Sequence, residues 1–312
     1  MSTLQQYIVA TRPWSFSMSA ISVTLGTLVA WRSGPVHWGA YVAALVGMVA
    51  MHAAGNVIND YFDSRHQVDR PDSPTVKYRP HPIVGGLMSL RTLLAEGVAL
   101  LAVAAAIGVG LAVFRTPLVV WTALAGFLLT FFYTAGPITL KYRALGEVAV
   151  FLVWGPLMFL GAYAVQRRAL GLEAVIASIP FGVLVALVLF ANNMRDIVQD
   201  SRSGIRTLGT LLGPERALTG FTGLMLAAYV YVIGAVAIGA FSPWMLLVFL
   251  SAPTAVSLVR TFRKGIPDAA DALTAKLDTV FGILFIIALV LERTVRGIGP
   301  LAALAFERAV RL

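Results

Sequence analysis

Residues 173–207 read EAVIASIPFGVLVALVLFANNMRDIVQDSRSGIRT, an apolar run that passes directly into a polar stretch with two aspartates. A helix needs about 20 apolar residues to cross the hydrocarbon core of a bilayer, and residues 173–193 meet that length. The run lacks the alternation that lipid-facing strands require. It therefore predicts a membrane-spanning helix that ends in a cluster of polar side chains.

Comparable apolar runs recur along the chain, bounded by Pro, Gly and charged residues. The composition agrees with them, because 58% of the residues are hydrophobic and only 12% are charged, whereas soluble domains carry about 25% charged residues. We expect an all-α, polytopic membrane protein, a bundle of nine transmembrane helices that forms a single domain over residues 1–312. The predicted spans are residues 15–31, 39–58, 93–114, 117–135, 146–165, 173–193, 217–239, 242–260 and 275–292.

The net charge of +9 comes from 24 Lys and Arg against 15 Asp and Glu. In a soluble protein this excess would suggest nucleic acid, but in a membrane protein it fits the positive bias of cytoplasmic loops. Lys and Arg are roughly twice as frequent in the loops on the side of the N-terminus, which predicts a cytoplasmic N-terminus, although the basic C-terminal tail opposes this. The chain has no Cys, which excludes disulfides, thiolate metal sites and a Cys nucleophile. We expect no cleaved signal peptide and no nucleic-acid partner.

A first acidic motif follows the second predicted span. Residues 56–72 read NVINDYFDSRHQVDRPD. Asn59 and Asp63 are four residues apart, so on a continuing helix they share one face, with Asn56 one turn above Asn59.

A second acidic motif ends the sixth predicted span, in the stretch quoted at the outset. Asn192, Asp196 and Asp200 are each four residues apart, which predicts a single stripe of oxygen-bearing side chains. The two motifs therefore repeat one design in two halves of the chain: Asn, three residues, Asp, and then a further Asp.

Carboxylate and amide oxygens are the hard ligands that suit Mg²⁺, which proteins hold by a few carboxylates together with substrate phosphates. Two such stripes that face each other across a cavity would hold Mg²⁺ against one diphosphate. The basic side chains beside the motifs, Lys77, Arg79 and Arg206, would bind phosphate oxygens. A single acidic motif is usually just solvated, but two matched motifs on one membrane face favour a metal–phosphate site.

These motifs, together with the RPHPIVGG and GIRTL stretches that follow them, resemble the UbiA superfamily of intramembrane prenyltransferases. The resemblance covers almost the whole chain. Residues 133–166, YTAGPITLKYRALGEVAVFLVWGPLMFLGAYAVQ, and TAKLD at 274–278 are similar to the branch of the superfamily that prenylates dihydroxynaphthoate.

The resemblance implies a set of site residues. Asn59, Asp63 and Asp69 match the first Mg²⁺–diphosphate motif, and Asp196 and Asp200 match the second, to which the repeated design adds Asn192. The residues expected to bind the diphosphate or its substrate side are Lys77, Arg79, Tyr133, Lys141 and Arg206.

The chain departs from the pattern of the superfamily at two places. Asp63 and Asp69 are six residues apart, where many members have four, so either Asp69 or Asp72 completes the first metal site. Ile205 stands where relatives often carry Lys, which removes one phosphate contact.

The resemblance implies Mg²⁺-dependent transfer of a polyprenyl group from its diphosphate to 1,4-dihydroxy-2-naphthoate, with decarboxylation. The Lys and Arg bias of the loops predicts that the active site faces the cytoplasm, and we expect a cell (inner) membrane. The expected partners are both substrates and the lipid bilayer, without an obligate protein partner. Two alternatives stay open: a different acceptor (4-hydroxybenzoate, homogentisate, a porphyrin or a lipid alcohol), and a cation or phosphate transporter. A transporter would place its acids at the middle of the bilayer, whereas these acids lie at one rim.

Two further residues have simpler interpretations. His52, within a predicted span, is expected to be a satisfied core histidine. Glu147, at the start of the fifth predicted span, is expected to stabilise the helix dipole.

Overall fold

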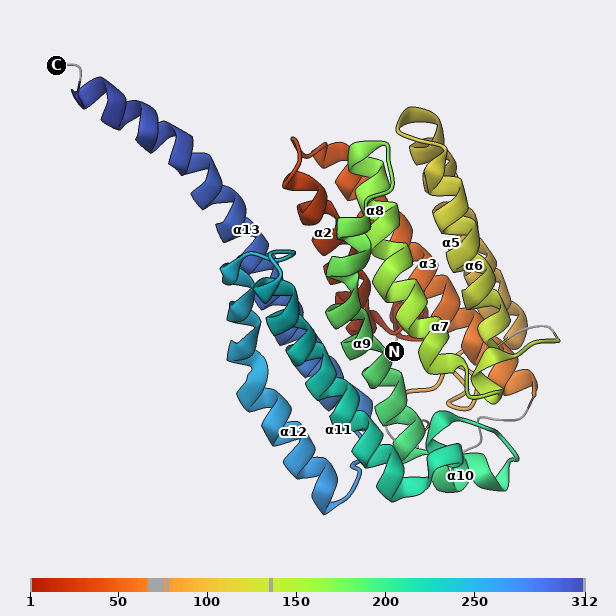
Figure 1. The fold of residues 1–312 in the computed structure, drawn as a ribbon. Coiled ribbons are helices and arrows are strands. Elements are labelled where there is room, and N and C mark those ends of the chain that lie inside the picture. The colour runs from red at the N-terminus through yellow and green to blue at the C-terminus, as the bar shows by residue number, and fades with distance from the viewer. Residues whose placement is uncertain (1, 67–75, 77–78, 135–136, 311–312) are drawn as a thin grey trace.

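A computed structural model places the chain in a bundle of helices (Figure 1). It describes residues 2–66, 76, 79–134 and 137–310, with residues 296–310 described by their backbone alone. All regular elements in this part of the chain are helical. They are α1 (Thr3–Ala10), η1 (Pro13–Ser15), α2 (Phe16–Trp31), α3 (Trp38–Arg65), α5 (Leu90–Phe114), α6 (Leu118–Thr134), η2 (Leu140–Tyr142), α7 (Gly146–Leu152), η3 (Val153–Leu157), α8 (Met158–Arg167), α9 (Leu172–Arg195), α10 (Ile197–Arg202), α11 (Leu208–Ala237), η4 (Pro243–Ser251), α12 (Ala252–Lys264) and α13 (Ala270–Val310).

The all-helical prediction is confirmed, but the count of nine spans is not. Within the described residues, 8 segments are long and apolar enough to cross a membrane. The predicted span at 117–135 corresponds to α6, which is apolar but shorter. Helix α3 continues to Arg65, beyond the predicted end at 58, and α11 begins at Leu208 rather than 217. Polar residues extend α3 because a helix outside the hydrocarbon core does not need an apolar surface. Helix α11 is instead interrupted by a kink at Gly213 (φ 72°), which Pro214 follows, close to the predicted start of the span.

Helices α7, η3 and α8 form one continuous span with a kink at its centre. Pro156 lacks an amide hydrogen, so the regular helix is interrupted there, and Gly155 leaves the helical conformation (φ −85°, ψ −108°). Gly155 packs against Gly182 of α9, where a Cβ built on Gly155 would lie 3.2 Å from the Gly182 Cα. The two glycines let α9 approach the kink closely. The Trp154 carbonyl accepts a hydrogen bond from Ser22 at 2.6 Å, which ties the kink to α2.

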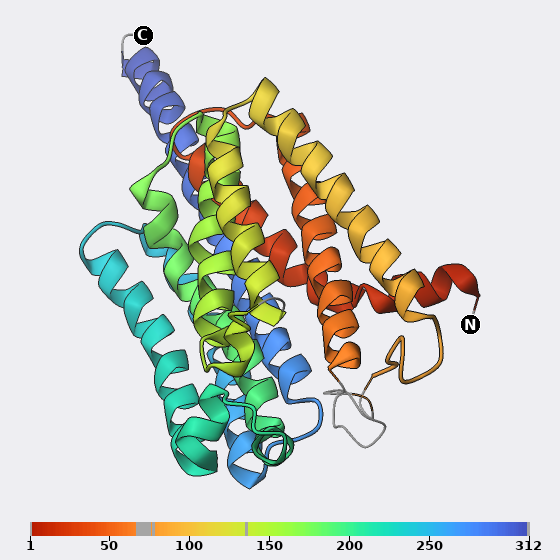
Figure 2. The same ribbon diagram turned by 90° about the vertical axis from the view of Figure 1, so that its right-hand side faces the viewer.

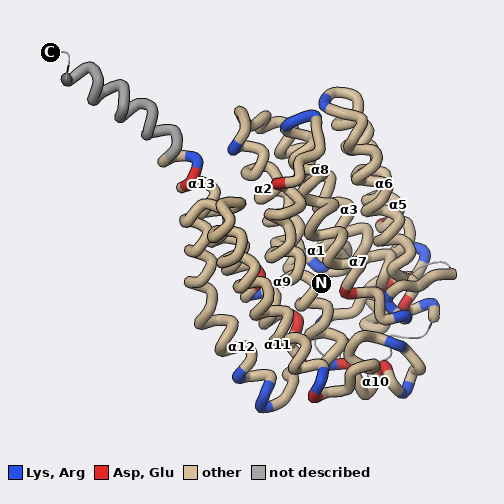
Figure 3. The backbone as a smooth tube through the Cα atoms, viewed as in Figure 1, with Lys and Arg blue, Asp and Glu red and all other residues tan. Residues whose placement is uncertain are grey.

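The centre of the bundle is formed by α2, α9 and α13, and buried aromatic rings such as Phe181, Phe281 and Phe285 belong to the core around them. Helix α1 runs across the bundle rather than along it (Figure 2). Charged residues are most numerous at the end that carries α10 and the C-terminal end of α12, a smaller number of mainly basic residues lies at the opposite end, and the body of the bundle is largely uncharged (Figure 3). We call the end that carries α10 the motif end.

Candidate functional site

A cavity of about 340 Å³ opens among α2, α3, α6, α7, α9 and α13. Both acidic motifs line it. The first contributes Asn59 and Asp63, and the second contributes Asn192, Asp196 and Asp200. The fold therefore brings together two segments that are more than a hundred residues apart in the sequence. The volume falls within the usual range for small-molecule sites, about 300–1,000 Å³.

The first motif lies on a helix, as predicted, because α3 is unbroken to Arg65. The Asn59 amide donates to the Asp63 carboxylate at 2.9 Å, so the two side chains do share a face. The Lys141 ammonium lies 2.6 Å from each Asp63 oxygen and 3.1 Å from Asn59 Oδ1. Tyr142 donates to Asp63 at 2.8 Å, and Thr134 donates to Asn59 at 2.8 Å. The pair is thus fixed by donors from the C-terminal end of α6 and from η2.

The second motif crosses a junction between two helices. Helix α9 ends at Arg195 and α10 begins at Ile197. Backbone hydrogen bonds still join Asp196 to Asn192 at 3.1 Å and Asp200 to Asp196 at 2.8 Å, so one stripe persists across the junction. The Arg195 guanidinium holds Asp196 through two hydrogen bonds of 2.8 Å and Asn192 through one of 2.5 Å.

Asp200 differs from the other three carboxylates that line the cavity, Asp63, Asp196 and Asp271. Among the described residues it forms no salt bridge, whereas Asp63 pairs with Lys141, and Asp196 and Asp271 pair with Arg195. Burial and the neighbouring Asp196 carboxylate raise the pKa of Asp200 to about 7. Asp200 is therefore the carboxylate of the cavity whose ionised form a bound cation would stabilise most.

The donor set fits magnesium held jointly with a diphosphate. Among the described residues, no group of three or more His, Cys, Asp or Glu side chains is arranged to hold a metal ion by itself. Mg²⁺ does not need such a cage, since it is commonly held by one or two carboxylates, water and substrate phosphates. Asp63, Asp196 and Asp200 offer only hard oxygen ligands into one cavity, which suits Mg²⁺ rather than softer metals.

Only some of the predicted diphosphate-binding residues line the cavity. Arg79, Tyr133 and Lys141 line the cavity. Arg206 is exposed and is not among the lining residues, although its carbonyl accepts a hydrogen bond of 2.7 Å from the Ala144 amide. Lys77, Asp69 and Asp72 lie outside the described residues.

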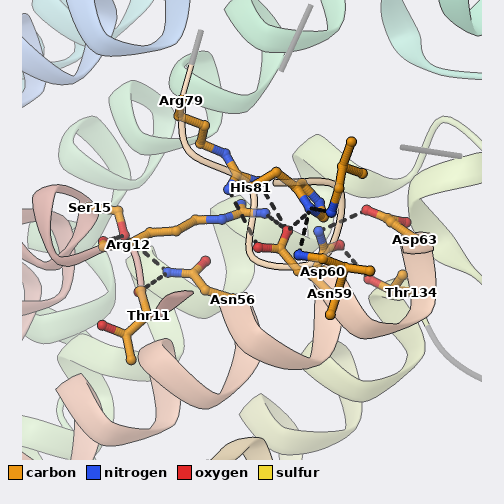
Figure 4. Close-up of polar contacts among 12 residues, drawn as sticks. Thr11, Arg12, Ser15, Asn56, Asn59, Asp60, Asp63, Arg79, His81 and Thr134 are labelled. Carbon is orange, nitrogen blue, oxygen red and sulfur yellow. Dashed lines mark hydrogen bonds and ion pairs between the residues drawn. The ribbon is translucent and has the colours of Figure 1, made fainter. Parts of the chain in front are cut away.

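The spacing of the first motif gave no role to Asp60. Asp60 is fully buried and does not line the cavity. Arg12 and Arg79 converge on it (Figure 4), Arg79 at 3.0 Å. Asp60 thus ties the N-terminal segment and the loop after the first motif to α3, directly beside Asn59. Asp60 directly follows Asn59 in the sequence, so on a helix it points away from the face that Asn59 and Asp63 share. This offset is the sequence feature that separates Asp60 from the residues that line the cavity.

Replacing Asp60 with alanine is expected to lower the free energy of unfolding by about 3–5 kcal/mol, because two guanidinium groups would lose a buried partner. Chemical denaturation in detergent micelles, followed by circular dichroism, measures this. The matched control is Asp268→Ala, which removes an exposed carboxylate and should change stability by no more than about 0.5 kcal/mol. Equal stability of the two variants would show that Asp60 is not a structural anchor.

The rest of the cavity wall is mostly apolar, with Met18, Met51 and Trp154 among its residues. His52 also lines it. Its ring nitrogens lie 3.2 Å from the Ser15 hydroxyl and 2.8 Å from the Ser19 hydroxyl. The interpretation of a satisfied histidine is confirmed, although its ring also faces the site.

Glu147 is in the first turn of α7, as predicted. It is buried and accepts a hydrogen bond of 2.8 Å from Asn193. The structure therefore adds a contact with α9, beside the second motif, that the dipole interpretation did not include.

The chain is similar to known proteins over most of its length. The model of the UbiA prenyltransferase family matches residues 19–290. The 1,4-dihydroxy-2-naphthoate octaprenyltransferase of Bacillus subtilis (strain 168) is 30% identical over 286 residues, which cover 90% of this chain and 91% of that protein. The UbiA prenyltransferase domain-containing protein 1 of Mus musculus is 33% identical over 291 residues, covering 91% of this chain and 84% of that protein.

Two solved structures share the fold. The apo structure of a UbiA homolog from Aeropyrum pernix K1 superposes with a TM-score of 0.68 at 18% identity and covers 89% of this chain and 97% of that one. A UbiA homolog from Archaeoglobus fulgidus bound to DMAPP and Mg²⁺ has a TM-score of 0.62 at 16% identity and covers 91% of this chain and 99% of that one.

Proposed function

Because the chain belongs to the UbiA prenyltransferase family and is a multi-pass integral membrane protein, we propose that it transfers a polyprenyl group from its diphosphate to 1,4-dihydroxy-2-naphthoate. The direct product after loss of the carboxyl group is demethylmenaquinol, the hydroquinone form of demethylmenaquinone. One observation carries the proposal: one Asn–Asp pair from α3 and one from the C-terminal end of α9, with Asp200, line a single cavity whose remaining wall is mostly apolar.

The residues that would hold Mg²⁺ are the oxygen-bearing side chains of the two motifs, Asn59, Asp63, Asp69, Asn192, Asp196 and Asp200. When bound, Mg²⁺ would neutralise the charge that develops on the departing diphosphate. Lys141 and Arg79 add positive charge on the same cavity. Tyr133 lines it close to Lys141, whose ammonium lies 6.0 Å from the centre of the ring. Lys77 and Arg206 complete the proposed set of diphosphate-binding residues.

The apolar part of the cavity suits the prenyl chain. Met18, Met51, Trp154, Val185 and Val188 contribute to it. Apolar walls exclude water from the reacting allylic carbon, and water would otherwise trap the electrophile. The carboxylates, with their bound metal, would therefore hold the diphosphate end of the substrate, and the apolar wall would hold its prenyl end.

The proposed reaction forms one bond and breaks two. The ring carbon that bears the carboxyl group attacks the allylic carbon of the prenyl chain, while the bond from that carbon to the diphosphate oxygen breaks. The diphosphate leaves with the electron pair of that bond. The carboxyl group then leaves as CO2, and its bonding electrons return to the ring. The hydroxyl groups of the naphthalene make the ring electron-rich enough to attack.

The choice of acceptor is supported by the Bacillus subtilis relative, which is named for it. Competition among acceptors in one detergent assay tests the choice: dihydroxynaphthoate, 4-hydroxybenzoate and homogentisate at equal concentration with one polyprenyl diphosphate. We expect the prenylated naphthalene to dominate the products. Prenylation of another acceptor instead would keep the metal site and overturn the acceptor.

The motif end is proposed to face the cytoplasm of a cell (inner) membrane, in keeping with the excess of Lys and Arg in the loops at that end. Because the chain contains no Cys, a single introduced thiol reports its side without background. A membrane-impermeant maleimide added to intact cells should label Ala169→Cys and spare Ser203→Cys, both of which are exposed positions. The reverse pattern would invert the orientation.

A further inference from the structure

Each Asn–Asp pair holds one basic side chain on the same three oxygen atoms. At the first pair, the Lys141 ammonium lies 3.1 Å from Asn59 Oδ1 and 2.6 Å from both Asp63 oxygens. These are the atoms that the proposed function assigns to a divalent cation. The ammonium group therefore occupies the position of a cation among them.

At the second pair, the Arg195 guanidinium has the corresponding contacts. It lies 2.5 Å from Asn192 Oδ1 and 2.8 Å from each Asp196 oxygen. The repeated design of the two motifs thus extends to their basic partners, which the sequence pattern alone did not pair.

The two basic side chains differ in how firmly they are held. Arg195 has a side chain that is 3% exposed, and it also donates to the Asp268 carbonyl at 3.0 Å and approaches Asp271 at 3.5 Å. Moving Arg195 would break the connection from α9 to the start of α13. An arginine with so many directional contacts is a fixed counter-ion.

Lys141 reaches its pair from η2, and its side chain is 16% exposed. Its ammonium is a point charge on a flexible stem, without the fixed fork of a guanidinium. The neutral donors Thr134 and Tyr142 would continue to hold Asn59 and Asp63 if Lys141 moved away. Lys141 therefore has the contacts of an exchangeable counter-ion.

We propose that a divalent cation enters the Asn59–Asp63 pair by displacing Lys141, which moves onto the diphosphate, while Arg195 stays in place and positions Asp196. This inference rests on the proposed function, since it assigns the order of events at the same metal–diphosphate site. It has a thermodynamic consequence. A divalent cation alone must expel an ammonium group from its partners, whereas a diphosphate offers that group a new partner, so the two ligands bind cooperatively.

Binding of Mn²⁺, a paramagnetic substitute for Mg²⁺, tests this without any turnover. Electron paramagnetic resonance measures free Mn²⁺ in the presence of the purified protein, with and without inorganic pyrophosphate. Lys141→Gln removes the competing charge and should tighten Mn²⁺ binding without pyrophosphate by about tenfold. In the wild-type protein pyrophosphate should tighten Mn²⁺ binding, and in Lys141→Gln this gain should shrink.

Two further variants test whether the effect of Lys141→Gln comes from the displacement of Lys141 from the Asn59–Asp63 pair or from the loss of any positive charge on the protein. Lys264→Gln removes an exposed charge near the C-terminal end of α12 and should leave Mn²⁺ binding unchanged. Arg195→Gln should weaken binding, because Asp196 loses the group that orients it; tighter binding would mean that Arg195 is also exchangeable and would refute its positioning role.

The outcomes also distinguish this inference from the proposed function. If the wild-type protein binds Mn²⁺ but Lys141→Gln binds it no more tightly, the exchange is refuted and the metal site stands. If the wild-type protein binds no Mn²⁺, even with pyrophosphate, the metal site and the exchange both fall. If Lys141→Gln tightens binding but the protein prenylates no acceptor, the exchange stands and the proposed function falls.

Discussion

Replacing Asp63 with alanine is expected to lower the rate of prenyl transfer by about a hundredfold or more, with the protein still folded. Asp63 is a carboxylate of the first motif that lines the cavity, and electrostatic groups that act on the charge of a transition state commonly contribute this much. The rate is measured with saturating prenyl diphosphate and dihydroxynaphthoate in detergent, and circular dichroism checks the fold.

The matched control for Asp63→Ala is Tyr142→Phe. It removes a neutral hydrogen bond of 2.8 Å to the same carboxylate, leaving the carboxylate charge in place, and should keep most of the activity. If Asp63→Ala retained near-normal turnover, the first motif would not be a metal–diphosphate site. If Tyr142→Phe lost as much activity as Asp63→Ala, the hydroxyl rather than the carboxylate charge would be the important group.

Replacing Asp200 with asparagine is expected to raise the Mg²⁺ concentration needed for half-maximal activity by about 10- to 100-fold. Asp200 forms no salt bridge among the described residues, so it is the carboxylate of the cavity with most to gain from a cation. The Mg²⁺ dependence of turnover measures this, with the exposed Asp268→Asn as control.

The same residue predicts a pH dependence. The pKa of Asp200 is raised to about 7, so below that pH the carboxyl group is increasingly protonated, and a proton competes with Mg²⁺. In the wild-type protein the Mg²⁺ requirement should therefore rise as the pH falls from about 8 to 6, and in Asp200→Asn this rise should be much smaller. An identical rise in both proteins would assign the titration to another group.

The parts of the site that follow a helical period could be predicted from the sequence. Asn59 with Asp63, and Asn192 with Asp196 and Asp200, are spaced by four residues, and such spacing determines a shared face wherever the backbone keeps its regular hydrogen bonds. The apolar runs likewise determined the helical class. Their number was less certain, because α6 is shorter than the other apolar helices that could cross a membrane.

Contacts that depend on how the helices pack could not be predicted. Lys141 was expected to bind diphosphate, but its position on the Asp63 carboxylate depends on the path of the segment after α6. Asp60 has the same residue type as Asp63 and is only three residues away, yet it lies off the cavity face and binds Arg12 from the N-terminal segment. Arg206 follows the second motif closely, but its side chain is exposed, and its sequence position gave no indication of this.

The most direct test of the account follows the carboxyl carbon of the acceptor. Purified protein is given Mg²⁺, a polyprenyl diphosphate and dihydroxynaphthoate with ¹³C in its carboxyl group, with and without EDTA, and both the product and the released gas are analysed by mass spectrometry. We predict a prenylated naphthalene without the label, an equal amount of ¹³CO2, and the loss of both with EDTA. Formation of the same product at an undiminished rate in EDTA, or no prenylated product from a folded protein, would contradict the account.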